Sequence, residues 1–176
     1  QRRIAKILNF GVLYGLGPHG VSQQTDLTRQ QGKEFIDLYF GKYPGIKDFQ
    51  KEQINSSKYK GYSETLLGRR RYLDDINSPN ARVRGFAERI AINMPIQGTA
   101  AEIIKIAMIN LGKEIRKNLM KSKMLIQVHD ELIFEVAPGE LMELSMMINE
   151  IMPNAIKLDV PVLVDIKTGD SWGKLE

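Results

Sequence analysis

The hydrophobic pattern of this chain changes at about residue 120, and this change restricts the fold to a mixed type. Before that point, apolar residues recur at helical spacing in segments separated by Gly and Pro. After it, residues 124–128 and 132–136 are apolar runs of strand length, followed by a helix over 139–152 and a last strand over 160–166. We therefore expect an α+β chain: a helical segment, then a β-hairpin, a helix and a further strand in an antiparallel or mixed sheet.

Capping and turn residues divide the first two thirds of the chain. Thr28 is a typical N-cap, and Gly61 ends a helix that starts after Tyr43 and Pro44. Pro95 and Gly98 interrupt a longer helical pattern. The expected helices span residues 1–14, 21–25, 29–43, 46–59 and 81–117, and the expected hairpin pairs residues 62–65 with 70–73.

Arg2, Lys6, Phe10 and Tyr14 recur every four positions at the start of the chain. On an α-helix they form one slowly spiralling stripe, in which two cations precede two aromatic rings. Fixed positive charges can hold phosphate oxygens, and flat rings can pack on a sugar and a base. The stripe therefore indicates a nucleoside triphosphate site. The alternative is an ordinary amphipathic helix whose aromatic residues face a core.

Positive charge is concentrated in the first part of the chain. Residues 1–100 carry 16 Lys or Arg against 9 Asp or Glu, a net charge of +7, whereas residues 101–176 carry 9 against 12, a net charge of −3. The first part has the charge of a polyanion binder, although many soluble domains have a solvated basic face without binding nucleic acid.

Several classes of site and location are excluded by composition. The chain has no cysteine, which excludes disulfides and thiolate zinc sites and favours a reducing intracellular compartment. His19 and His129 lie far apart in the sequence, which argues against a histidine metal cluster. No apolar run approaches the roughly 18 residues of a membrane span, so we expect no membrane association.

Three adjacent ionisable residues, His129, Asp130 and Glu131, join the two apolar strands. One explanation is an ordinary solvated turn. The other is that rigid strands present carboxylates to a metal ion. Carboxylate oxygens suit Mg²⁺, and a Mg²⁺ site that acts on phosphates needs only one or two of them from the protein. The sequence thus combines cations suited to a triphosphate with ligands suited to Mg²⁺.

Five motifs follow one another in a fixed order along the chain. They are Arg2-x-x-x-Lys6-x-x-x-Phe10-x-x-x-Tyr14-Gly15, Thr65-Leu66-x-Gly68-Arg69-Arg70-Arg71, Glu88-Arg89-x-x-x-Asn93-x-Pro95-x-Gln97-Gly98-Thr99-Ala100-Ala101, Val128-His129-Asp130-Glu131 and Asp159-Val160-Pro161. Together they resemble the family A DNA polymerases, the bacterial DNA polymerase I type, over the whole chain. The first resembles the nucleotide-binding helix of the fingers, the third the helix that contacts primer and template, and the fourth the palm carboxylate motif.

The resemblance implies a domain organisation and an activity. Residues 1–60 would be fingers helices and residues 61–176 a palm portion, with the upstream palm, the thumb and any exonuclease domain outside this sequence. The parent protein would be a DNA-directed DNA polymerase in the bacterial cytoplasm. It would transfer nucleotides from dNTPs to a primer 3′-hydroxyl by a two-metal mechanism with Mg²⁺.

The stripe residues acquire nucleotide-binding roles through this resemblance. Arg2 and Lys6 would bind the β- and γ-phosphates, and Lys6 would also be a catalytic residue that donates a proton to the leaving pyrophosphate. Phe10 would pack on the incoming sugar, where the family uses Phe to disfavour dideoxynucleotides. Tyr14 would lie near the templating base.

The remaining motifs acquire roles on DNA and metal. Arg89, Asn93 and Gln97 would hold the minor-groove side of the primer-template, and His129 would lie near the primer terminus. Asp130 would be the catalytic metal ligand, with Glu131 close by and less essential. Spaced four apart, the three helical side chains share one face and can read minor-groove acceptors common to all base pairs.

We expect this sequence to be a segment that lacks activity by itself. The first residue is Gln1, and the first helix is already under way there. The family takes its second catalytic Asp from a strand upstream of the fingers helix. The missing palm strands also predict an exposed sheet edge and self-association. Two alternatives to a polymerase remain: a nucleic-acid-binding module without catalysis, and a partner-binding remnant whose motifs survive by descent.

Residues 15–20 match G-x-G-x-x-G, the dinucleotide-binding fingerprint. That motif functions only after a strand and at the start of a helix. Here it follows a helix and contains Pro18, so we expect a loop that terminates the helix.

Overall fold

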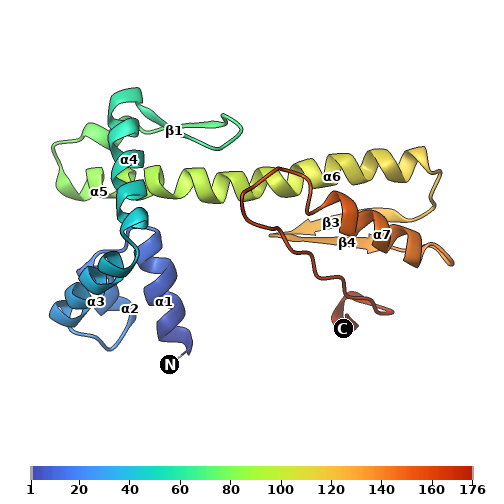
Figure 1. Cartoon of the computed structure of the whole chain (residues 1–176), viewed down its shortest axis with the longest axis horizontal. Helices are drawn as coiled ribbons and strands as arrows, with labels where there is room; N and C mark the ends of the chain where they lie inside the picture. Colours follow the sequence, from blue (N-terminus) through green and yellow to red (C-terminus); the bar gives the residue numbers. More distant parts are fainter. Residues whose placement is uncertain (1, 176) are drawn as a thin grey trace. The chain divides into compact units, whose positions relative to one another are not determined.

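The computed structural model describes residues 2–175, apart from the side chain of Arg3 (Figure 1). The chain divides into two units, residues 1–99 and 100–176. Elements of the first unit are α1 (Arg2–Leu13), α2 (Pro18–Gln24), α3 (Arg29–Lys42), α4 (Pro44–Lys60), β1 (Tyr62–Glu64), β2 (Arg70–Tyr72), the 3₁₀ turn η1 (Asp74–Asn77), α5 (Ala81–Asn93) and the π turn η2 (Met94–Gly98). Those of the second are α6 (Thr99–Lys117), whose first residue still belongs to the first unit, β3 (Lys123–Val128), β4 (Glu131–Glu135), α7 (Leu141–Ile151) and the 3₁₀ turn η3 (Trp172–Lys174). The predicted α+β class is confirmed.

Helix ends in the first unit follow the capping residues of the sequence. The Thr28 hydroxyl accepts the N–H of Gln31 at 3.2 Å, and the Gln31 side-chain oxygen accepts the N–H of Thr28 at 2.8 Å. This reciprocal pair is a capping box and starts α3. Gly61 follows α4 with a φ of +78°, a left-handed conformation that glycine adopts without steric cost.

The core of the first unit lies where α5 packs on η1. Leu73, Ile76, Ala87 and Ala91 are buried there together. α4 runs across α5 and contacts β1 (Figure 1). The predicted β1–β2 hairpin is present and antiparallel, and Ser63 lies opposite Arg71. The hairpin and α5 therefore share one packed region.

The predicted interruption of the helix near Pro95 and Gly98 takes the form of a π turn. α5 continues through η2 into α6, so the chain remains helical from Ala81 to Lys117. Such wide turns occur mostly as single-turn bulges inside α-helices, often at functional sites.

The second unit buries one cluster of apolar side chains between α6, α7 and one face of the β3–β4 hairpin. Its buried members are Leu111, Ile115, Leu144 and Ile148. Met124, Leu132, Phe134 and Met147 pack against them. The helix predicted over residues 139–152 is α7, in which Met147 packs on this cluster, whereas Met142 and Met146 are exposed.

The β3–β4 hairpin is antiparallel and contains a β-bulge. Met124 pairs with Phe134 and Ile126 pairs with Ile133, so Leu125 is an extra residue without a partner on β4. Beyond the bulge the register is regular and ends with Val128 opposite Glu131.

The predicted last strand over residues 160–166 is wrong: this segment has no strand structure. A strand needs a neighbour to receive its backbone hydrogen bonds, and the described residues place no strand beside this one. Pro161 also lacks an N–H. Val164 still packs on the core of the second unit, whereas Leu163 is 87% exposed. The alternation of apolar and polar residues in this segment thus corresponds to alternating burial, although the segment does not pair in a sheet.

No helix within residues 2–175 is both long enough and apolar enough to cross a membrane. The longest, α6, has 19 residues and includes Glu102, Lys105 and Lys113.

Candidate active site

The stripe at the start of the chain lies largely in solvent. Arg2 and Lys6 are exposed on α1, and Phe10 is 47% exposed. Leu8 and Val12 are buried and anchor the helix. The Phe10 and Tyr14 rings stack with their centroids 6.4 Å apart and their planes at 22°. Phe10 thus lies at the surface and does not fit the alternative in which these rings fill a core, whereas Tyr14 is half-buried.

α1 ends in a Schellman motif centred on Gly15, which has a φ of +84°. The N–H of Leu16 donates to the Gly11 carbonyl at 2.7 Å, and the N–H of Gly15 donates to the Val12 carbonyl at 3.1 Å. The first three residues of the G-x-G-x-x-G match therefore form the loop that ends α1, as its position after a helix predicts. Its last three residues are not loop, because α2 begins at Pro18.

A residue that the sequence did not single out also holds this helix end. The side-chain amide of Gln50, on α4, donates to the carbonyls of Val12 at 2.8 Å and Leu13 at 3.0 Å. The last carbonyls of a helix have no partner within the helix, so this amide supplies a donor from another element. No local pattern marks Gln50, because its partners lie 37 and 38 residues away.

The end of the stripe lies beside the predicted primer-template residues. A Cβ built on Gly15 would be 3.0 Å from Ile92 Cδ1 and 3.4 Å from Arg89 Cγ, both on α5. A side chain at position 15 would therefore crowd α5. Within the first unit, the structure brings the Tyr14–Gly15 end of the stripe next to Arg89.

Arg89, Asn93 and Gln97 lie along α5 and η2 with different environments. Arg89 and Gln97 are exposed, and the Arg89 guanidinium lies 5.8 Å from the ring centroid of Phe86, which is 60% exposed. Asn93 Oδ1 is buried and has no hydrogen-bond partner among the described residues. A buried acceptor without a donor costs about 1–3 kcal/mol. Contact with minor-groove acceptors would use the side-chain nitrogen of Asn93, which donates, and not this oxygen.

The turn of the β3–β4 hairpin presents His129 and Asp130. The sequence placed three residues between the strands, but Glu131 belongs to β4 and pairs with Val128, which leaves a turn of two residues. His129 has a φ of +54°, and Gln127 donates its side-chain amide to the His129 carbonyl at 2.9 Å. A positive φ at the first turn position normally favours glycine. A histidine there is strained, as is common at functional sites.

The donor chemistry of this turn fits part of a Mg²⁺ site. Asp130 and Glu131 are adjacent, exposed carboxylates with oxygen ligands of the kind Mg²⁺ prefers. Within residues 2–175, no group of three or more His, Asp or Glu side chains gathers as a complete metal cluster. A metal role for Asp130 and Glu131 stays a prediction.

A carboxylate clamp closes the other end of this hairpin. The Glu140 carboxylate accepts the N–H groups of Lys121 and Ser122, both at 2.9 Å, and the Ser122 hydroxyl at 2.6 Å. Ser122 Oγ in turn accepts the N–H of Ala137 at 3.0 Å. The hydrogen bond from Lys121 is the main cause that lowers the pKa of Glu140, followed by those from Ser122. The clamp ties together the segments that enter and leave the hairpin.

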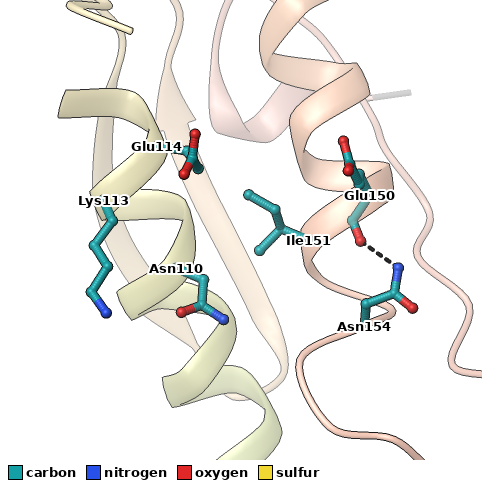
Figure 2. Close-up of a pocket in the computed structure, with 6 residues that line it drawn as sticks. All are labelled: Asn110, Lys113, Glu114, Glu150, Ile151 and Asn154. Atoms are coloured by element: carbon teal, nitrogen blue, oxygen red, sulfur yellow. Dashed lines mark hydrogen bonds between the residues drawn. The ribbon is translucent and has the colours of Figure 1, made fainter. Parts of the chain in front are cut away.

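A pocket in the second unit involves none of the predicted site residues. It encloses about 320 Å³ between α6 and α7 and is lined by Asn110, Lys113, Glu114, Glu150, Ile151 and Asn154 (Figure 2). The Asn154 side-chain amide donates to the Glu150 backbone carbonyl at 2.7 Å, and Glu114 pairs with Lys117 at 3.1 Å. The Asn154 amide and the Glu114 carboxylate are thus engaged in contacts within the second unit.

The predicted site residues are divided between the two units. Arg2, Lys6, Phe10 and Tyr14, together with Arg89, Asn93 and Gln97, belong to residues 1–99, whereas His129, Asp130 and Glu131 belong to residues 100–176. The combination of the two sets in one active site stays a prediction. So does the boundary between fingers and palm at residue 60.

Comparison with known proteins places these features in a family. Residues 1–174 match the model of DNA polymerase family A. Over 172 residues, the chain is 48% identical to DNA polymerase I of Streptococcus pneumoniae serotype 4 and 47% identical to that of Geobacillus stearothermophilus, covering 98% of this chain and 20% of each relative. The chain thus spans about a fifth of the length of these curated relatives.

A solved structure shows the same similarity in three dimensions. The POL domain of Pol1 from M. smegmatis, in complex with DNA primer-template and dNTP, matches with a TM-score of 0.93 and 44% sequence identity. The match covers 97% of this chain and 30% of that chain. The motifs, the fold and the relatives agree, and the chain belongs to DNA polymerase family A.

Proposed function

We propose that this chain is part of a DNA-directed DNA polymerase that transfers nucleotides from dNTPs to a primer 3′-hydroxyl. The observation that carries the proposal is the solvent-facing stripe on α1, with Arg2, Lys6 and Phe10 exposed, in a chain that matches DNA polymerase family A over residues 1–174. The M. smegmatis relative in complex with primer-template and dNTP supports DNA and dNTP as partners.

The stripe binds the incoming nucleotide in this proposal. Arg2 and Lys6 hold the β- and γ-phosphates through charge-assisted hydrogen bonds, which are stronger than neutral ones. Lys6 then donates a proton to the leaving pyrophosphate. Phe10 packs on the sugar, and its stacking on Tyr14 keeps a continuous aromatic surface from the sugar toward the templating base.

The second set of residues holds the primer-template. Arg89, Asn93 and Gln97 contact the minor-groove side, where acceptors are shared by all base pairs and report pairing geometry without sequence. His129 lies near the primer terminus, on the strained turn that also carries Asp130.

Asp130 is the metal ligand of this chain, with Glu131 beside it. When bound, Mg²⁺ activates the primer 3′-hydroxyl and stabilises charge on the triphosphate. A two-metal site needs a further bridging carboxylate, which we expect from a strand upstream of Gln1. The isolated chain should therefore lack polymerase activity, and appreciable Mg²⁺-dependent primer extension by residues 1–176 alone would contradict this expectation.

Primer extension by the complete polymerase that contains this segment tests the function. Asp130→Ala should lower the extension rate by about 10²-fold or more while primer-template binding persists, because a metal contributes several kcal/mol of transition-state stabilisation. Asp165→Ala is the matched control, since Asp165 is exposed outside any predicted motif. Full activity of the Asp130→Ala enzyme would rule out the metal role and favour a remnant.

The net charge of +7 on residues 1–100 favours a second candidate, a nucleic-acid-binding module without catalysis. Filter binding of primer-template by residues 1–176 over a salt series tests it. Affinity that falls steeply with salt indicates phosphate contacts, and no binding at low salt removes this candidate. The intracellular location and the self-association expected from an exposed sheet edge stay predictions.

A further inference from the structure

Three contacts join the β1–β2 hairpin to the π turn and to the end of α5 before it. The first contact involves the helical proline. Pro95 has no N–H, so it cannot donate the hydrogen bond that position 95 of an α-helix gives to the carbonyl of residue 91. The Ser63 hydroxyl, from β1, donates to the Ala91 carbonyl at 3.0 Å. Ser63 is 3% exposed, so this donor lies inside the packed region.

The second contact is made by Thr99, at the end of the π turn. Its hydroxyl donates to the Pro95 carbonyl at 2.5 Å and accepts the N–H of Leu66 at 3.1 Å. Leu66 lies in the loop of the hairpin, between β1 and β2. One buried hydroxyl therefore connects the hairpin loop to the π turn, and Thr99 is only 5% exposed.

The third contact is steric. A Cβ built on Gly98 would lie 2.5 Å from the Thr65 methyl and 3.2 Å from the Met94 thioether. Thr65 is 4% exposed, and its hydroxyl accepts the N–H of Arg69 within the hairpin. The hairpin thus rests directly on the glycine, and a side chain there would push it away.

These contacts are made on both sides, in the sequence, of the two residues whose side-chain amides are predicted to contact DNA. The anchored positions are Ala91, Pro95, Gly98 and Thr99, whereas Asn93 and Gln97 lie between them in the sequence. Gln97 is exposed, and Asn93 Oδ1 is buried without a partner among the described residues. Because a π turn is less favourable than a regular helix, an outside element that bonds to it selects the wide conformation.

We propose that the β1–β2 hairpin is a positioning element: Ser63, Thr65 and Thr99 fix the π turn in the conformation that presents Asn93 and Gln97 to the minor groove of the primer-template. In this role Ser63 and Thr65 act on DNA binding indirectly, through the conformation of the helix. The proposal rests on the proposed function, because it assumes that Asn93 and Gln97 read minor-groove acceptors.

The test combines a protein substitution with a DNA substitution in the complete polymerase. Thr99→Val keeps the shape and removes the hydroxyl, Thr99→Ser restores the hydroxyl, and Ser63→Ala removes the first contact. Thr168→Val, at an exposed position of the second unit, is the matched control. Each enzyme binds primer-template with ordinary purines or with 3-deazapurines, which lack the minor-groove nitrogen acceptor. Thermal unfolding sets a temperature at which all variants are folded.

In the native enzyme, the 3-deazapurine should raise the Kd for primer-template about 3- to 10-fold, the usual range for one lost hydrogen bond. In Thr99→Val and Ser63→Ala this ratio should fall toward one, while Thr99→Ser and Thr168→Val should keep the native ratio. A residue that only stabilises the fold would leave the ratio unchanged.

Two outcomes overturn the proposal for different reasons. An equal response to the 3-deazapurine in the native enzyme, Thr99→Val and Ser63→Ala would show that Asn93 and Gln97 are positioned without the hairpin. No response in the native enzyme would show that these amides do not read the groove, so that the proposed function of this face fails first.

Discussion

The side-chain amide nitrogen of Gln50 lies 2.8 Å from the carbonyl oxygen of Val12, so α4 supplies a donor that the end of α1 lacks. Arg2, Lys6 and Phe10 of the stripe are residues of α1. Its end is thus set from two sides, by the left-handed Gly15 and by an amide from another element.

Gln50→Leu should therefore weaken both the fold and nucleotide binding. Loss of the two hydrogen bonds leaves two carbonyls without this donor, and we expect a stability loss of about 1–2 kcal/mol. In the complete polymerase, the KM for dNTP should rise several-fold. Urea unfolding and steady-state extension measure the two effects. Gln53→Leu, on the same helix, is the control, and a KM equal to the native one in Gln50→Leu would contradict the prediction.

His129→Gly should raise the free energy of unfolding and weaken primer-template binding. The φ of +54° is costly for a histidine and free for glycine, so the variant should gain about 1 kcal/mol in unfolding free energy. It should also bind primer-template more weakly, because it loses the imidazole expected near the primer terminus. His129→Ala separates the effects, since it removes the ring and keeps the strain. A variant His129→Gly less stable than His129→Ala would count against strain at this turn.

The clamp of Glu140 makes the second unit sensitive to acid. Its hydrogen bonds lower the pKa of Glu140 in the folded chain below the ordinary carboxyl value of 4.5. The stabilisation is therefore present above that value and is lost as the pH falls through the lower folded pKa. In urea unfolding, Glu140→Gln should flatten this acid limb below pH 4.5, whereas Glu143→Gln, in the first turn of α7, should keep it. Equal acid limbs in the native chain and Glu140→Gln would argue against the clamp.

Leu119→Gly should stabilise the chain. Leu119 follows α6 with a φ of +54°, and the N–H of Met120 donates to the Ile115 carbonyl at 3.1 Å, as in a Schellman motif that usually has glycine at this place. We expect a gain of about 0.5–1 kcal/mol, since relief of the left-handed strain exceeds the entropy cost of glycine. Leu163→Gly is the control, because both leucines are 87% exposed and only Leu119 has a positive φ. A lower unfolding midpoint for Leu119→Gly would contradict this.

The parts of the fold that follow from neighbouring residues could be predicted from the sequence. Thr28 and Gly61 mark helix ends through contacts within a few residues, and the β1–β2 hairpin follows from its turn. The stripe on α1 is likewise a local property of a regular helix.

The parts that depend on distant partners could not be predicted in this way. The segment 160–166 has the alternation of a strand, but a strand also needs a neighbour, which no pattern within seven residues specifies. Pro95 predicted an interruption, yet the donor to Ala91 comes from Ser63, 28 residues away. Gln50 was missed for the same reason.

Because Leu125 has no partner on β4, its position is the place where β3 can lose one residue without a change of register. Side chains alternate along a strand, so an insertion or deletion normally shifts the register and exchanges the two faces. Removing Leu125 alone would leave Met124 opposite Phe134, Ile126 opposite Ile133 and Val128 opposite Glu131. At this one place, a single-residue deletion would convert the bulge into a regular ladder while His129 and Asp130 kept their places in the turn.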